Sequence, residues 1–507
     1  MNKFLNGLTD ATNYTVTENG ATTYKSTKSM LLDMFAMGAA YRTRSDEDVI
    51  LLFMNAYKEN PEYALKCLFY IADCRGGQGE RRFFRICYKW LAKYDTEAAR
   101  RNMKHIPIYR RWDDLYILVG TPLENEMFEF LKEQLALDIN SKTPSLLAKW
   151  LKSENTSSYK SRTLGNKTRI AFNMSHKQYR KVLSVLRQRI NIVERLMSEN
   201  RWAEIEFDKI PSRAGMIYKN AFAKHDLERA KADARTYEDF IKDETTKVNA
   251  KTLYPYECVA AALKDWHDLP IDSTERAAIN KYWDNLEDYF KEAVFNGMAV
   301  VDTSGSMTGY EASAPINVAI SLGMYCAEKA KGPYNGHFIT FSSNPSFVKV
   351  EGVDFYNKAR RILNADWGGS TNIEATFDLM LNTAIKNKCT QDEIPQNLII
   401  ISDMEFDSCA TSGPVSSHRW YGGHRIDNKE TLFETIRNKW ASYGYKMPKL
   451  TFWNVQARQN NIPMQDDGNV RYVSGMSPVI FEQVMKNLSA YDLMMDKLNS
   501  NRYAIIG

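Results

Sequence analysis

The spacing of apolar residues changes near residue 293, and the parts of the chain on either side must fold differently. Between about residues 30 and 290, apolar residues recur three or four positions apart, as in Phe83, Cys87, Trp90 and Leu91. This is the spacing of amphipathic helices. After residue 293, short apolar runs alternate with helical segments. A chain of 507 residues also exceeds what one hydrophobic core supports. We therefore predict two domains, residues 1–292 and residues 293–507.

The first domain is predicted to consist of short helices in series. One helix begins after Ser45 and ends before Pro61, a second ends at Gly76, and further helices begin at Thr143 and Ser175. Roughly six two-helix units of the HEAT size would fill this length. Stacked units of this kind leave a continuous surface free for a partner. We expect an α-helical, HEAT-like repeat array in the shape of a ring or a horseshoe.

The second domain is predicted to be an α/β fold. Expected strands lie at residues 298–301, 337–341, 346–350, 397–401, 450–455 and 470–473. Expected helices lie near residues 314–331, 373–386, 429–440 and 478–488. Short buried strands that alternate with helices are typical of a doubly wound, mainly parallel sheet. Such sheets bind ligands at the carboxyl ends of their strands.

Side chains with oxygen atoms follow the ends of these expected strands. Asp302, Ser304 and Ser306 come directly after the first strand, Thr371 lies in a loop that begins at Gly368, and Asp403 ends a buried run. Hydroxyl and carboxylate oxygens without Cys or His suit a hard cation such as Mg²⁺, Mn²⁺ or Ca²⁺, and suit Zn²⁺ poorly. The sequence predicts a divalent-cation site, with Mg²⁺ as the first choice. The alternative is that these residues are ordinary helix caps and turn residues.

The three segments in this order resemble the metal-ion-dependent adhesion site of von Willebrand factor A domains. The resemblance rests on the Asp302-Thr-Ser-Gly-Ser306 motif, the Gly368-Gly-Ser-Thr371 loop and the Ser402-Asp403 strand end. It implies that Ser304, Ser306 and Thr371 bind the metal directly. Asp302 and Asp403 would bind directly or through water, and an acidic group of a partner protein would complete the coordination shell. The metal would then serve binding, and no catalytic set is expected.

Basic residues are concentrated in residues 141–190, although the net charge of the whole chain is only +5. This stretch holds seven Lys and five Arg against the single acid Glu154. Such a surface is typical of binding to nucleic-acid phosphates, and aromatic residues nearby could stack on bases. RNA is favoured over DNA because no DNA-binding motif is recognisable. The candidate RNA-binding residues are Lys160, Arg162, Lys167, Arg169, His176, Lys177, Arg180, Lys181 and Arg187. The alternative is a solvated helix surface.

Helical repeats followed by a von Willebrand factor A domain resemble the TROVE-module Ro autoantigen proteins. Four short motifs are similar to a sister family of plant and phage proteins, and they lie at residues 17–20, 75–81, 221–226 and 253–255. The resemblance implies a ring-shaped protein that binds small structured RNAs or single-stranded RNA ends. A protein-interaction scaffold or adaptor without RNA is the alternative function, and a metal-dependent hydrolase is a weaker one.

The cellular compartment is predicted from the first residues of the sequence and from the spacing of the cysteines. The first residues show no apolar run of signal-peptide length, and no stretch is apolar enough to span a membrane. The seven cysteines have no CxxC spacing, which is typical of buried thiols in a reducing compartment. We expect a cytoplasmic protein, without a membrane partner, that is a monomer.

Overall fold

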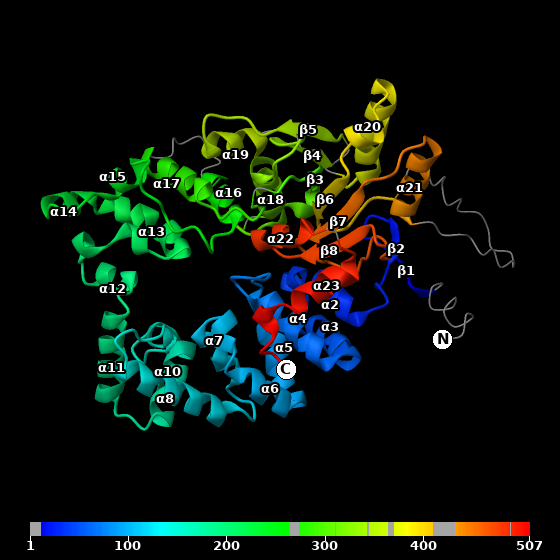
Figure 1. The fold of residues 1–507 in the computed structure, drawn as a ribbon. Coiled ribbons are helices and arrows are strands. Elements are labelled where there is room, and N and C mark those ends of the chain that lie inside the picture. The colour runs from blue at the N-terminus through cyan, green and yellow to red at the C-terminus, as the bar shows by residue number, and fades with distance from the viewer. Residues whose placement is uncertain are drawn as a thin grey trace.

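A six-stranded sheet forms the centre of the second part of the chain in the computed structural model (Figure 1). The structure describes residues 12–263, 273–291, 293–309, 311–341, 344–363, 370–408, 431–486 and 488–507. The strands are β3 (Gly297–Asp302), β4 (His337–Phe341), β5 (Ser346–Lys349), β6 (Asn397–Ser402), β7 (Lys449–Asn454) and β8 (Val470–Ser474). Each of them overlaps a strand that the sequence predicts.

The strand order of this sheet is β5-β4-β3-β6-β7-β8. All neighbouring pairs are parallel except β4 and β5, which are antiparallel. The chain therefore starts in the middle of the sheet, builds outward to β5, and returns to build the other half from β6. This is the doubly wound order, and its reversal point lies between β3 and β6. The predicted doubly wound, mainly parallel sheet is confirmed.

The strands are apolar on both faces because helices cover both. Met298 and Val300 of β3 belong to one hydrophobic core, and Ala299 and Val301 belong to the other. The first core includes residues of α2 (Met30–Met37), α20 (Ile373–Asn387), α21 (Leu432–Ser442) and α23 (Ala490–Leu498). The second includes residues of α16 (Pro255–Leu263), α18 (Pro315–Lys329), α19 (Phe355–Leu363) and α22 (Phe481–Val484).

The helices of the first part follow an arc that leaves the sheet and returns to it (Figure 1). The arc begins where α2 packs on β8 and ends where α16 and α17 pack on α18 and α19. Its other helices are α3 (Asp46–Glu59), α4 (Pro61–Ala72), α5 (Arg81–Tyr94), α6 (Thr96–Met103), α7 (Ile106–Tyr109), α8 (Glu124–Asn140), α9 (Leu147–Trp150), α10 (Tyr159–Ala171), α11 (His176–Arg189), α12 (Val193–Ser198), α13 (Ser212–Lys224), α14 (Asp226–Lys231), α15 (Tyr237–Lys242) and α17 (Ser273–Asp284). The first part is thus mostly helical, as predicted. Helix lengths from four to seventeen residues follow no single repeating unit, so a HEAT-like repeat is not confirmed.

The two helices that were predicted from a capping residue begin where the sequence places them. A third predicted helix begins elsewhere. Ser45 and Ser175 cap α3 and α11, each accepting a hydrogen bond from a backbone N–H three residues later. The helix expected to begin at Thr143 begins instead at Leu147 and has only four residues. Arg187 binds the carbonyl oxygens of Ala148 and Leu151, so this short helix ends where a side chain from α11 replaces the next helical hydrogen bond.

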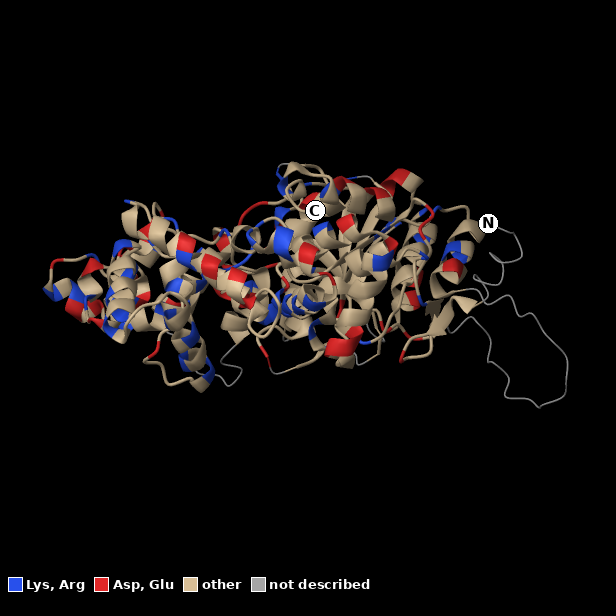
Figure 2. Cartoon of the chain, turned by 90° about the horizontal axis from the view of Figure 1, so that it is seen from below, with Lys and Arg blue, Asp and Glu red and all other residues tan. Residues whose placement is uncertain are grey.

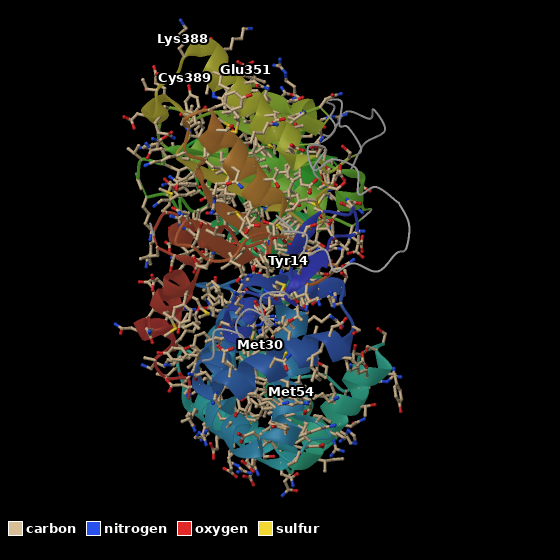
Figure 3. All side chains as sticks on the ribbon, turned by 90° about the vertical axis from the view of Figure 1, so that its right-hand side faces the viewer. Tyr14, Met30, Met54, Glu351, Lys388 and Cys389 are labelled. Carbon is tan, nitrogen blue, oxygen red and sulfur yellow. The ribbon has the colours of Figure 1, made fainter. Side chains whose placement is uncertain are left out.

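The N-terminal segment packs against the sheet part of the chain, and the C-terminal segment packs against the first helices. The hairpin of β1 (Tyr14–Val16) and β2 (Thr22–Tyr24) pairs with the sheet part through a bridge between Tyr24 and Ile462. Figure 3 shows Tyr14 at the junction between the sheet and the first helices. At the other end, the Arg502 guanidinium pairs with the fully buried carboxylate of Asp73, after α4. Both terminal segments therefore tie the first helices to the sheet part.

The Asp73–Arg502 pair is expected to contribute to stability because Asp73 is buried. Replacing Arg502 by Met should lower the free energy of unfolding by about 3 kcal/mol, since it removes the cationic partner of a buried carboxylate. Urea denaturation followed by circular dichroism measures this change. The control is Lys486→Met, which removes an exposed ion pair with Asp496 and should cost less than about 1 kcal/mol. Equal losses in the two variants would contradict the prediction.

Candidate functional site

Asp302 and Ser402 end the two central strands at the point where the winding of the sheet reverses. Val301 lies opposite Ile401, so the next residues of β3 and β6 reach the same edge. The Ser402 hydroxyl donates to Asp302 Oδ2 at 2.6 Å, and the backbone N–H of Ser304 donates to Asp302 Oδ1 at 2.9 Å. Both carboxylate oxygens of Asp302 are thus held in place. A ligand at this edge would meet a preformed group.

The two serines of the motif converge beside Asp302. Their Oγ atoms lie 3.0 Å apart on the short turn that follows β3. Ser304 is buried and Ser306 is half-buried, so the pair lies at the boundary between the interior and the solvent. Two hydroxyl oxygens at this separation can bind one cation together.

Asp403 and Thr371 complete the edge from the other loops. Asp403 is buried, and its Oδ1 accepts the backbone N–H of Glu405 at 3.2 Å. Its Oδ2 has no hydrogen-bond partner among the described residues, and the nearest cation is Arg458 Nε at 3.5 Å. Thr371 is held to the same loop because its N–H donates to Asp407 Oδ2 at 2.9 Å. Gly368 and Gly369 of its loop lie outside the described residues.

The buried carboxylates at this edge are only partly balanced by the guanidinium group of Arg458. Burial, together with the charge of Asp403, raises the pKa of Asp302 to about 7. Burial also raises the pKa of Asp403, and it raises the pKa of Glu405 to about 7. Carboxylates that are removed from water in this way are stabilised by a bound cation. Asp403 Oδ2, which accepts no hydrogen bond among the described residues, and the paired serine hydroxyls therefore fit a divalent cation with oxygen ligands.

The carboxylates alone do not form a metal site. In the part of the chain that the structure describes, no three His, Cys, Asp or Glu side chains are grouped so that they could hold a metal ion. The five predicted ligands include only two carboxylates, Asp302 and Asp403. A cation here would depend on the hydroxyl groups of Ser304, Ser306 and Thr371.

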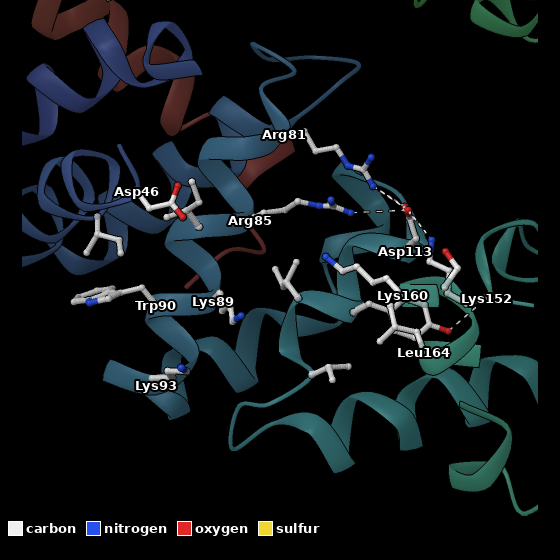
Figure 4. Close-up of a pocket in the computed structure, with 16 residues that line it drawn as sticks. Asp46, Arg81, Arg85, Lys89, Trp90, Lys93, Asp113, Lys152, Lys160 and Leu164 are labelled. Atoms are coloured by element: carbon white, nitrogen blue, oxygen red, sulfur yellow. Dashed lines mark hydrogen bonds and ion pairs between the residues drawn. The ribbon is translucent and has the colours of Figure 1, made fainter. Parts of the chain in front are cut away.

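A basic groove lies between α5 and α10 on the helical arc (Figure 4). Its volume is about 740 Å³. Six basic side chains line it, against two acidic ones: Arg81, Arg85, Lys89, Lys93, Lys152 and Lys160, with Asp46 and Asp113. The four on α5 are Arg81, Arg85, Lys89 and Lys93. They recur every four residues, so their side chains form one stripe along the helix. This regular stripe faces the first turns of α10.

The acidic residue at the centre of the groove is already neutralised. Asp113 accepts Arg81 Nη2 at 2.9 Å and Lys152 Nζ at 3.3 Å, as Figure 4 shows. Lys89, Lys93 and Lys160 are exposed, and they form no ion pair within the described residues. The groove therefore presents unpaired positive charge. Basic and acidic side chains are interspersed over much of the chain (Figure 2), whereas α10 and α11 contain no Asp or Glu.

An aromatic stack lies beside these lysines. The rings of Trp90 and Tyr94 are stacked, with centroids 4.3 Å apart and planes 17° from parallel. Trp90 lines the groove, and Tyr94 is 56% exposed. Exposed ring faces next to lysines are the elements with which proteins bind single-stranded nucleic acids.

Comparison with known proteins identifies the family. A family model described as a domain of unknown function (DUF2828) matches residues 17–127 and 141–294, more than half of the chain. The chain belongs to the DUF2828 family. A second model, a domain of unknown function (DUF7788), matches residues 296–501 of this DUF2828 chain. A similar protein is the uncharacterized protein L728 of Acanthamoeba polyphaga mimivirus, which is 31% identical over 518 residues. That match covers 93% of this chain and 85% of the mimivirus protein.

Solved structures that are similar to this DUF2828 chain include the crystal structure of the Deinococcus radiodurans Ro (RSR) protein, at 12% identity and a TM-score of 0.41. The match covers 93% of this chain and 99% of that chain.

Within the described residues, no helix has the length and apolar character needed to cross a membrane.

Several of the predicted RNA-binding residues of this DUF2828 chain are engaged in contacts within the protein. Arg169 and His176 both bind the buried Glu154, and Lys167 pairs with Glu124. Arg162 donates to the carbonyl oxygens of Thr156 and Ser157, and all three nitrogens of Arg187 donate to backbone or side-chain oxygens. Lys160, Lys177, Arg180 and Lys181 are exposed. The charge that is free to bind a ligand is therefore smaller than the count of basic residues indicates.

Sequence reasoning missed three residues at the sheet edge that carries the predicted metal ligands Asp302, Ser304, Ser306, Thr371 and Asp403, which we call the metal edge: Glu18, Asn19 and Arg458. Asn19 Nδ2 donates to Thr371 Oγ1 at 3.1 Å and to the carbonyl oxygen of Glu405 at 2.6 Å. Glu18 and Arg458 form an ion pair beside Asp403. The Thr17–Gly20 motif was recognisable only as part of a family resemblance, since no local spacing links residue 19 to residue 371.

Proposed function

We propose that this DUF2828 chain is an RNA-binding protein of the Ro and TROVE type, with the RNA held in the groove between α5 and α10. The supporting observation is the combination of unpaired lysines in the groove with Trp90, which lines it and stacks on the exposed ring of Tyr94. Lysine ammonium groups pair with phosphates, and ring faces stack on bases of any sequence. Lys177, Arg180 and Lys181 would continue this surface onto α11, the next helix of the arc.

The groove suits a single strand better than a duplex. A ring face can stack only on a base that is not already stacked within a helix. The partner that fits is thus a single-stranded RNA end or the unpaired part of a small structured RNA. The helical arc would supply the repeat-like frame, in which α5 and α10 face one another.

Fluorescence anisotropy tests the proposal with the purified chain. The probe is a structured RNA with a single-stranded 3′ tail, compared with duplex DNA of matched length at two salt concentrations. We expect tighter binding to the tailed RNA and a salt dependence with a slope of about −2 to −4, which corresponds to three to six phosphate contacts on a single strand. Equal affinity for the duplex DNA at low salt would favour the scaffold function, in which the same surfaces bind acidic protein segments.

A second function is proposed for the sheet part, as a von Willebrand factor A-type domain that binds Mg²⁺. Its ligands would be Ser304, Ser306 and Thr371, supported by Asp302 and Asp403. The support is the position of Asp302 and Asp403 at the reversal point of the sheet, together with the lack of a hydrogen bond to Asp403 Oδ2 among the described residues. The cation would supply a positive charge that accepts an acidic oxygen of a partner. Its role would be in binding and not in catalysis.

A further inference from the structure

Arg458 is the basic side chain in contact with Asp403 at the metal edge. Its Nε lies 3.5 Å from Asp403 Oδ2, and its Nη2 donates to the carbonyl oxygen of Ser306. Its third nitrogen, Nη1, lies 3.4 Å from Glu18 Oε2. The side chain is 34% exposed. The guanidinium group of Arg458 thus contacts two of the proposed metal ligands and also reaches solvent.

Glu18 is brought to Arg458 by the turn between β1 and β2. The Thr17 hydroxyl donates to the carbonyl oxygen of Phe406 at 2.6 Å, and the Glu18 N–H donates to Glu405 Oε2 at 2.7 Å. Gly20 has a φ of +91° and bridges to Asp407, which closes the turn onto the loop after β6. The backbone of residues 17–20 is therefore fixed on the metal edge.

The Glu18 carboxylate is held much less firmly than its backbone. The side chain is 43% exposed, and the ion pair with Arg458 is its one side-chain contact recorded among the described residues. An exposed ion pair of this kind contributes about 1 kcal/mol or less. Another carboxylate could therefore replace Glu18 on Arg458 while the turn stays in place.

We propose that Arg458 and the metal edge together form a carboxylate-binding site, and that Glu18 is its built-in occupant. An acidic segment of a partner protein would exchange with Glu18 on Arg458 and present its oxygens to the cation. A carboxylate is favoured over a phosphate because Asp403 already lies against Arg458, and its negative charge would repel a dianion more strongly than a single carboxylate. The Mg²⁺ dependence rests on the proposed metal centre, whereas the exchange on Arg458 does not.

The test uses a fluorescein-labelled hexaglutamate peptide and the full chain. Glu18→Gln should bind the peptide about three- to fivefold more tightly than the unchanged chain, because the internal competitor is removed while the backbone contacts remain. Glu18→Asp should also bind more tightly, since the shorter side chain keeps its charge and reaches Arg458 less well. Arg458→Gln should bind at least tenfold more weakly than the unchanged chain. Glu47→Gln, which removes an exposed acidic charge on α3, is the matched control and should leave the affinity unchanged.

The outcomes separate this proposal from that of the metal centre. Unchanged peptide affinity in Glu18→Gln, or an equal gain in Glu47→Gln, would overturn the role of Glu18, and so would the absence of peptide binding by every variant. If titration calorimetry detects no Mg²⁺ binding, the metal centre fails, but Glu18→Gln should still bind the peptide more tightly in EDTA through Arg458. A gain in Glu18→Gln that Glu18→Asp lacks would indicate long-range charge in place of occupancy, and would also overturn the proposal.

Discussion

Replacing Asp302 by Asn is expected to weaken Mg²⁺ binding about 100-fold while the protein stays folded. The amide has nearly the shape of the carboxylate: its oxygen can still accept the Ser304 N–H, and its NH₂ group can donate to the Ser402 hydroxyl, which now donates to Asp302. It lacks the negative charge that a divalent cation requires. A factor of 100 corresponds to about 2.7 kcal/mol. Isothermal titration calorimetry with Mg²⁺, and with Mn²⁺ as a second cation, measures the loss.

The same variant is expected to be at least as stable as the unchanged chain when metal is absent. Burial disfavours the charged form of Asp302, as its raised pKa shows, so a neutral amide removes an electrostatic cost. RNA affinity should change less than twofold, because the groove lies on the helical arc. The control is Asp392→Asn, which removes an exposed carboxylate near the opposite end of β6. Mg²⁺ binding that survives in Asp302→Asn would place the cation elsewhere.

The triple replacement Lys89→Gln, Lys93→Gln and Lys160→Gln is expected to weaken binding to the tailed RNA about 30-fold. These three side chains carry the positive charge of the groove that the described acidic residues do not neutralise. The slope of the logarithm of affinity against the logarithm of salt concentration should become shallower by about 2, since each lost contact with a single strand removes about 0.7. Anisotropy at several salt concentrations measures both quantities.

The matched control removes the same charge from another part of the arc. It combines Lys224→Gln, Lys231→Gln and Lys251→Gln. These three lysines lie between the end of α13 and the start of α16, and they are also exposed. We expect this variant to lose less than threefold in affinity and to keep the salt slope. A further single change, Tyr94→Leu, should cost about five- to tenfold, because it removes one face of the aromatic stack. Equal losses in the two triple variants would show that only net charge attracts RNA.

The elements that sequence reasoning located correctly have their signals in adjacent residues. The run Met298–Val301 is apolar at every position because β3 is covered on both faces, and this property is visible without any knowledge of the neighbouring strands. The caps at Ser45 and Ser175 act within one helical turn. The helix expected at Thr143 begins only at Leu147, and it ends after four residues where Arg187 binds the carbonyl oxygens of Ala148 and Leu151.

The glycine-rich motif at residues 75–81 shows what a local pattern leaves open. Its glycines are required by close packing, because a side chain at Gly79 would overlap the Tyr254 hydroxyl and one at Gly77 would overlap the carbonyl oxygen of Tyr70. Gln78 donates to the Ser474 hydroxyl at the end of β8. The motif thus joins α4, β8 and the loop before α16. Its partners lie up to about 400 residues away in sequence.

The sequence by itself determined the order of strands and helices in the second part and the adjacency of Asp302, Ser304 and Ser306, because these depend on spacing within a few residues. Only the tertiary structure decided that Glu18, Asn19 and Arg458 meet at the metal edge. It also decided that the α5 stripe faces α10, and that Arg169 and Arg187 are used inside the protein. These contacts join residues far apart in the chain. They form only when the arc of helices returns to the sheet, and no local pattern of residue types encodes that return.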